Sequence, residues 1–184
     1  MAEPTAEIKA CIRHASDLFS LDPIHLLIFA KVESNFDPKA RNPKSYASGL
    51  FQFLGPTARE ENIDPFCVPE AAGATAKKVY SSLKMLEKLG IPETTTNLYL
   101  CHQQGQRGFS QIWSAYSGDS VLSFARIRNM VANLPRSISR ELNTAEKTSS
   151  EMAEIFIGWW DSRIARAEKQ VEKIYDEILC DDFR

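Results

Sequence analysis

The chain has 184 residues, with 22 basic and 24 acidic side chains and a formal net charge of −2. This length suits one solid core with an appended subdomain. The balanced charge gives no attraction to nucleic acid or to an anionic membrane, and no apolar run approaches the roughly 20 residues that span a bilayer. Neither a nucleic-acid partner nor a transmembrane segment is therefore expected.

Helical signals dominate the first part of the chain. Residues 5–19 are predicted to form an amphipathic helix, because their apolar side chains recur at helical spacing. Asp22-Pro23 is typical of a helix start and Asn35 of a helix end, so a second helix is predicted over 22–34. Residues 36–54 are rich in Pro, Asn, Ser and Gly, which predicts an irregular lobe with a small hairpin that lines a cleft.

Further helices are predicted in the middle of the chain. Gly55-Pro56-Thr57 begins a short one, and Pro69-Glu70 begins one that ends at Leu89 and Gly90. Residues 94–101 and 110–116 complete the compact part, with a loop between them. The fold class predicted is mainly α, with a small irregular or β lobe.

The tail differs in character. One helix is predicted after residue 121 and stops near Leu134-Pro135. Thr148-Ser149-Ser150-Glu151 then reads as a capping box for a helix of about 30 residues, roughly 45 Å long. We expect residues 1–120 to form one domain and residues 121–184 a helical extension. That extension either packs on the core or docks to a partner.

Cysteine and histidine spacing gives no sign of a metal site. The four cysteines form no Cys-x-x-Cys pair and the three histidines lack ligand spacing, so no metal and no cofactor are expected. The cysteines are interpreted as mostly buried thiols: Cys11, Cys67, Cys101 and Cys180.

Glu33 is the candidate catalytic residue. It falls in the last turn of the predicted helix 22–34, after the apolar run Leu26–Val32. The negative end of the helix dipole and the apolar surroundings both disfavour its ionised form and so raise its pKa. A carboxyl that stays protonated near neutral pH can act as a general acid. The alternative is a solvated glutamate at a helix end.

The run Gly49-Leu50-Phe51-Gln52-Phe53 favours the catalytic interpretation. Such a run can bring backbone groups and an amide beside the carboxyl, where they would hold a sugar. A Gln between two Phe residues is expected to point into a cleft. Together the two segments predict cleavage of a glycosidic bond.

Residues 22–116 resemble the soluble lytic transglycosylases of the lysozyme-like superfamily. The resemblance lies in Ala30-Lys31-Val32-Glu33-Ser34-Asn35-Phe36, Ala47-Ser48-Gly49-Leu50-Phe51-Gln52-Phe53 and Pro56-Thr57-Ala58. It implies a lysozyme-like fold whose single acid, Glu33, cleaves between N-acetylmuramic acid and N-acetylglucosamine in peptidoglycan. The muramyl 6-hydroxyl then closes a 1,6-anhydro ring without water. The substrate-binding residues implied are Ser34, Gly49, Leu50, Gln52 and Phe53.

A third family motif, Ala-Tyr-Asn-x-Gly, falls on Cys101-His102-Gln103-Gln104-Gly105 and departs from the pattern. His102 replaces the family tyrosine and Gln103 replaces the asparagine. A ring N–H of His102 can supply the same hydrogen bond as the tyrosine, and the alternative is a structural histidine with satisfied hydrogen bonds. Gln103 and Gln104 are further candidates for substrate binding in this loop, and Gly105, Arg107 and Gly108 are placed at a cleft edge.

Because of this departure, a hydrolytic muramidase stays open as an alternative. It would need a second carboxylate, roughly 6.5–9.5 Å from the acid for inversion. The candidates nearest in sequence are Asp37, Glu60, Glu61 and Asp64.

Two other functions stay open. A chitin-active enzyme could share the fold, and the chain could be a structural component of a phage tail or secretion apparatus with a wall-binding module. The acidic, polar start Met1–Glu7 lacks the basic stretch and the apolar core of a secretory signal. We therefore expect synthesis in the cytoplasm and action at the cell wall or periplasm, through phage lysis, a virion or a secretion machine.

Overall fold

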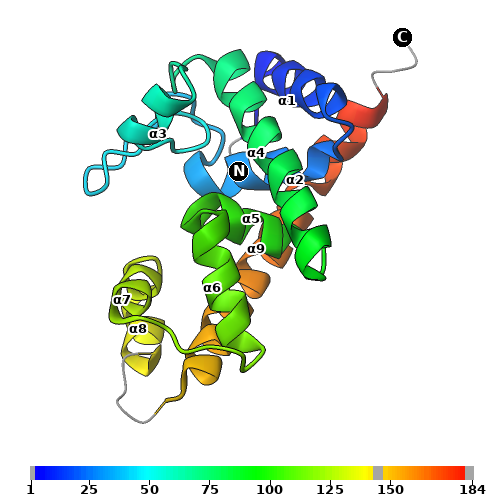
Figure 1. Cartoon of the computed structure of the whole chain (residues 1–184). Coiled ribbons are helices and arrows are strands. Elements are labelled where there is room, and N and C mark those ends of the chain that lie inside the picture. The colour runs from blue at the N-terminus through cyan, green and yellow to red at the C-terminus, as the bar shows by residue number, and fades with distance from the viewer. Residues whose placement is uncertain (1–2, 143–146, 181–184) are drawn as a thin grey trace. The chain divides into compact units, whose positions relative to one another are not determined.

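The structure is a computed structural model that describes residues 3–142 and 147–180. Over these residues the chain is mainly α, as predicted, and Figure 1 shows its helices in chain order. The only β pairing in this described part consists of the isolated bridges Arg41–Ser48 and Ser48–Phe53. None of the helices described is both long and apolar enough to cross a membrane.

The contacts within the chain divide it into two units. Unit 1 comprises Met1–Lys84 together with Ile164–Arg184, and unit 2 comprises Met85–Arg163. Two long helices, α4 (Val68–Leu89) and α9 (Ser149–Cys180), have residues in both units. Unit 1 is therefore discontinuous in sequence.

Unit 1 begins with two packed helices, α1 (Ala6–Leu18) and α2 (Pro23–Ser34). Thr5 and Asp22 cap them: the Thr5 hydroxyl accepts from the Ile8 N–H at 3.3 Å, and the Asp22 carboxylate accepts from the Ile24 N–H at 2.9 Å. Each cap satisfies a donor that has no partner within its helix. Both helices start within one residue of the predicted position.

The irregular lobe lies between α2 and α4 and contains α3 (Gly55–Glu60). Ser48 and Phe53 exchange both backbone hydrogen bonds, at 3.0 and 2.9 Å, and so form the predicted small hairpin. Glu61, just after α3, is bound by Lys77 and Lys78 of α4 at 3.0 and 2.9 Å. These ion pairs fix the end of α3 to α4.

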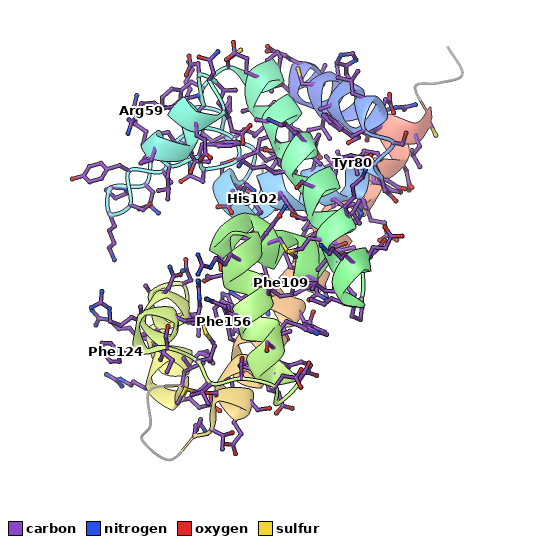
Figure 2. The ribbon with its side chains drawn as sticks, viewed as in Figure 1. Arg59, Tyr80, His102, Phe109, Phe124 and Phe156 are labelled. Atoms are coloured by element: carbon purple, nitrogen blue, oxygen red, sulfur yellow. The ribbon has the colours of Figure 1, made fainter. Side chains whose placement is uncertain are left out.

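The last part of α9 also belongs to unit 1. Tyr175 donates to the Asp22 carboxylate at 3.2 Å, Lys9 pairs with Glu177, and Arg13 donates to the Ile178 carbonyl. Its apolar face is buried: Ile164, Ala167, Val171, Ile174 and Ile178. Also in unit 1, the Phe19 ring lies 5.8 Å from the ring of Tyr80 on α4, and Tyr80 is labelled in Figure 2.

Unit 2 is built around α5 (Thr95–Gln104) and α6 (Gln106–Tyr116), which pack together and are separated by Gly105 alone. The pair α7 (Phe124–Ala132) and α8 (Arg136–Leu142) follows. Phe109 of α6 and Phe156 of α9, both labelled in Figure 2, are fully buried in this unit. The capping box is confirmed: Thr148 N–H donates to the Glu151 carboxylate at 2.7 Å, and Glu151 N–H to the Thr148 hydroxyl at 3.2 Å.

Three sequence-based expectations were wrong. The loop expected around 102–109 is helical on both sides of Gly105, whose φ of 71° interrupts the two helices. The short helix α8 was not predicted. Of the cysteines only Cys101 is buried, because Cys11 and Cys67 lie at the border of the core and Cys180 lies at the exposed end of α9.

Candidate active site

Glu33 lies one residue before the end of α2 and is half-buried. The helix stops because Asn35 and Phe36 both take left-handed backbone angles, with φ of 53° and 66°. Their N–H groups donate back to the carbonyls of Lys31 and Ala30, at 3.1 and 3.3 Å. This C-cap satisfies carbonyls that would otherwise lack partners and fixes the position of Glu33 in the last turn.

Ser34 connects the end of α2 to the Gly49–Phe53 loop. Its hydroxyl lies 2.8 Å from the Leu50 carbonyl oxygen and 3.1 Å from that of Ala30, and its single proton can be donated to either. The two segments that the sequence singled out are therefore in contact. The Gly49–Phe53 loop is held directly beside the residue that follows Glu33.

The loop turns at Gly49, a position that only glycine can occupy. Its φ is +79°, and a Cβ built there would lie 1.7 Å from the carbonyl oxygen of Pro65. Its N–H donates to the Ala40 carbonyl at 2.9 Å. Glycine is thus required both by the backbone angle and by the close approach of another backbone segment.

The Gln52 side chain fixes the loop through hydrogen bonds to backbone carbonyls. Its side-chain Nε2 donates to the Gly49 carbonyl at 3.0 Å and lies 3.4 Å from that of Ala40. Its Oε1 accepts no hydrogen bond from residues 3–142 or 147–180. The amide nitrogen therefore fixes the lobe, while the amide oxygen stays available to a ligand.

The apolar residues of the loop serve as anchors. Leu50 and Phe51 are 0% exposed and Phe53 is 3% exposed. The side chains of Leu50 and Phe53, two of the predicted substrate-binding residues, pack in the core. Any contact of these two residues with a glycan falls to their backbone atoms.

The third group of predicted site residues lies in unit 2. His102, Gln103 and Gln104 form the last turn of α5 and are half-buried. The His102 ring lies 6.3 Å from that of Tyr99, and Gln104 donates to Gln103 at 3.0 Å. These residues are helical rather than part of a loop, as are Arg107 and Gly108 in the first turn of α6.

Three of the four carboxylates considered as the water-activating base of a hydrolase already accept hydrogen bonds within unit 1. Hydrogen bonds from Lys78 and Lys77 hold the pKa of Glu61 below its usual range. Asp37 and Asp64 accept the N–H groups of the residues two positions on, at 2.8 and 3.0 Å. These bonds are turn contacts of the kind that Asp side chains commonly make.

A separate groove of about 760 Å³ lies in unit 1, and Glu33 is not among its lining residues. There the Arg41 guanidinium lies over the Phe66 ring at 4.4 Å. The groove is lined by Glu7, Pro38, Lys39, Arg41, Phe66, Cys67, Val68 and Pro69. Within the described residues, no group of three or more His, Cys, Asp or Glu side chains is placed to hold a metal ion.

Sequence reasoning did not single out Arg126 of α7, which lies against the start of α6. Its Nε and Nη2 donate to the Gln111 side-chain oxygen at 3.2 and 3.0 Å, and its Nη1 lies 3.4 Å from that of Gln104. A Cβ at Gly108 would lie 2.5 Å from Nη1. No local spacing signals this contact, because the partners are far apart in sequence.

A family model matches the segment that contains Glu33. Residues 10–86 match the family model described as the transglycosylase SLT domain. This segment belongs to that family. The SLT segment contains both Glu33 and the Gly49–Phe53 loop, so the resemblance to soluble lytic transglycosylases is confirmed there.

The match indicates a peptidoglycan lytic transglycosylase that acts on the cell wall, with a mainly α, lysozyme-like fold. His102, Gln103 and Gln104 lie beyond the matched residues. No curated protein matches the chain.

Proposed function

We propose that the SLT segment cleaves the β-1,4 bond between N-acetylmuramic acid and N-acetylglucosamine, with Glu33 as its single acid and base. The observation that carries the proposal is the hydrogen bond between Ser34 and the Leu50 carbonyl, at 2.8 Å. It fixes the Gly49–Phe53 loop beside a half-buried carboxyl at a helix C-terminus.

The reaction needs one proton donor that later becomes an acceptor. Protonated Glu33 gives its proton to the glycosidic oxygen, and the bond from that oxygen to the muramyl C1 breaks. The Glu33 carboxylate then accepts the proton of the muramyl 6-hydroxyl as its oxygen bonds to C1. The products are a free 4-hydroxyl and a 1,6-anhydro ring, and Glu33 is protonated again without the consumption of water.

The other site residues have supporting roles in this proposal. Ser34 and Gln52 keep the loop in place through their bonds to backbone carbonyls, and the Gln52 oxygen is left to accept from an acetamido N–H. The backbones of Gly49, Leu50 and Phe53 form the adjoining surface. His102, Gln103 and Gln104 are proposed as further substrate-binding residues.

Mass spectrometry of the soluble products from purified peptidoglycan tests the proposal. The wild type is expected to release anhydro-muropeptides, and Glu33→Gln to release at least about a hundredfold less, within the range for loss of a general acid. Glu168→Gln, an exposed carboxylate on the unit 1 part of α9, is the matched control and should retain activity. Full activity of Glu33→Gln would overturn the assignment.

The masses also separate the two reaction types. Products heavier by one water would mean hydrolysis and a second carboxylate. Of the candidates, Glu61 is neutralised by two lysines, which makes it a poor water-activating base.

We further propose that the enzyme opens the wall locally for a phage or a secretion system, with residues 121–184 as the docking extension. The apolar face of α9 is buried, so docking in this proposal falls to the exposed side of the helix. Recovery of the chain in purified virions or secretion particles would carry this proposal, and its absence from both would remove it.

A further inference from the structure

The contact between Arg126 and α6 holds a positive charge that has no negative partner among the residues that the structure describes. The guanidinium is half-buried against Gly108, and within the described part of the chain it bonds only to the neutral side-chain oxygens of Gln111 and Gln104. Among residues 3–142 and 147–180, no carboxylate forms an ion pair with Arg126 or with Arg107. A partly buried arginine is ordinarily paired with an acid.

The positive charge of Arg107 adds to the unpaired positive charge of Arg126. Loss of water around the guanidinium lowers the pKa of Arg126, and repulsion from the Arg107 cation lowers it further. Both effects show that unit 2 holds this cation at a cost. An anion placed between the two arginines would offset the burial and the repulsion at once.

Arg126 keeps hydrogen-bond donors with which it can bind such an anion. The two glutamine oxygens accept one hydrogen bond from each of Nε, Nη2 and Nη1, so one N–H on each of the two terminal nitrogens is still available as a donor. Arg107 is exposed in the first turn of α6 and can add its own fork. Two guanidinium groups with a shared acceptor are suited to a planar carboxylate.

We propose that Arg126 and Arg107 bind a carboxylate of the peptide stems of peptidoglycan. This proposal rests on the proposed function, because it takes the wall as substrate. The N-acetylated sugars of the glycan carry no charge when their lactyl groups are in amide linkage, whereas the stems end in free carboxylates. The site would thus distinguish glycan strands by the state of their stems.

The test is a comparison of native walls with walls whose carboxylates have been converted to methylamides, both free of teichoic acid. Binding is measured by sedimentation with Glu33→Gln as the background, so it does not require cleavage. That background is expected to bind native walls about tenfold more tightly than amidated ones. Addition of Arg126→Gln, or separately of Arg107→Glu, should remove this preference and leave the weaker binding to amidated walls.

Three controls make the result specific. Arg128→Gln removes an exposed arginine of the same helix, whose guanidinium lies 5.9 Å from the Phe124 ring, and should keep the preference. Thermal unfolding checks that each variant is folded. Arg107→Glu is the safeguard if Arg126→Gln destabilises the α6–α7 contact, because it gives Arg126 an internal carboxylate without removal of any bond that Arg126 makes.

The outcomes are distinguishable from those of the proposed function. If Arg107→Glu keeps the preference, or if amidation does not weaken binding of the background protein, the carboxylate site is overturned. Competition by inorganic phosphate as strong as that by N-acetyl-D-alanyl-D-alanine at equal ionic strength would also overturn it, in favour of a phosphate source. Failure of the wild type, with Glu33 intact, to release any product from native walls, with the binding preference of the background protein intact, would overturn the enzymatic proposal and keep this one.

Discussion

At the residue scale, Gly49 in the loop beside the proposed catalytic carboxyl should tolerate substitution by a larger residue poorly. Gly49→Ala is expected to destabilise the protein by at least about 3 kcal/mol, because it combines a strained positive φ with a Cβ 1.7 Å from the Pro65 oxygen. Chemical unfolding measures the change.

The matched control is Gly73→Ala in α4, also in unit 1. A Cβ at Gly73 meets nothing within 4 Å and its backbone is helical, so the substitution should be neutral or stabilising by up to about 1 kcal/mol. Equal effects of the two substitutions would contradict the argument for Gly49.

At the element scale, the Glu61 ion pairs make the contact between α3 and α4 depend on pH. Lys78 and Lys77 depress the pKa of Glu61 below its ordinary value of 4.5. A carboxyl with a depressed folded-state pKa contributes stability that is present above 4.5 and is lost as the pH falls through the folded pKa. Unit 1 should therefore lose stability in acid partly through this residue.

Urea unfolding at several pH values between about 3 and 7 checks this prediction. Glu61→Gln should be less stable than the wild type near neutral pH and should lose less stability in acid. Glu60→Gln changes an exposed neighbour without these ion pairs and should follow the wild type. Parallel curves for the wild type and Glu61→Gln would show that Glu61 carries no such dependence.

How far the sequence predicts the elements depends on whether their signals are local. The ends of α2 and the start of α9 follow from caps that lie within a few residues, Asp22-Pro23 and Thr148 with Glu151. The position of the Gly49–Phe53 run beside the end of α2 was expected from the two segments together, but the hydrogen bond of Ser34 to Leu50 was not. In contrast, Gly108 was placed in a loop, and its close fit against the Arg126 side chain was not predicted. That fit arises only when α7 lies against α6. No spacing within the sequence reports such a contact.

At the scale of the whole molecule, unit 1 depends on a helix that lies far from the SLT segment in sequence. Val171 of α9 is fully buried in this unit, and Val171→Ala should cost about 2 kcal/mol through lost burial and a residual cavity. Glu172→Ala, on the exposed side of the same turn, should change stability by less than about 0.5 kcal/mol.

Chemical unfolding together with wall cleavage by the same variants measures this dependence. The SLT segment should unfold in the same transition as α9, so wall cleavage by Val171→Ala should be lost at a lower denaturant concentration. Retention of cleavage at the wild-type concentration despite lower stability would show that the segment is independent of α9.

The discontinuous chain path of unit 1 also orders events during synthesis. Glu177 and Ile178, which bind Lys9 and Arg13, leave the ribosome only after every helix of unit 2 has been made. The nascent SLT segment must therefore wait, with the α9-facing sides of α1 and α2 uncovered, and long-range closures of this kind are slow. A growing chain would hold its wall-cleaving segment unfinished until α9 has been made.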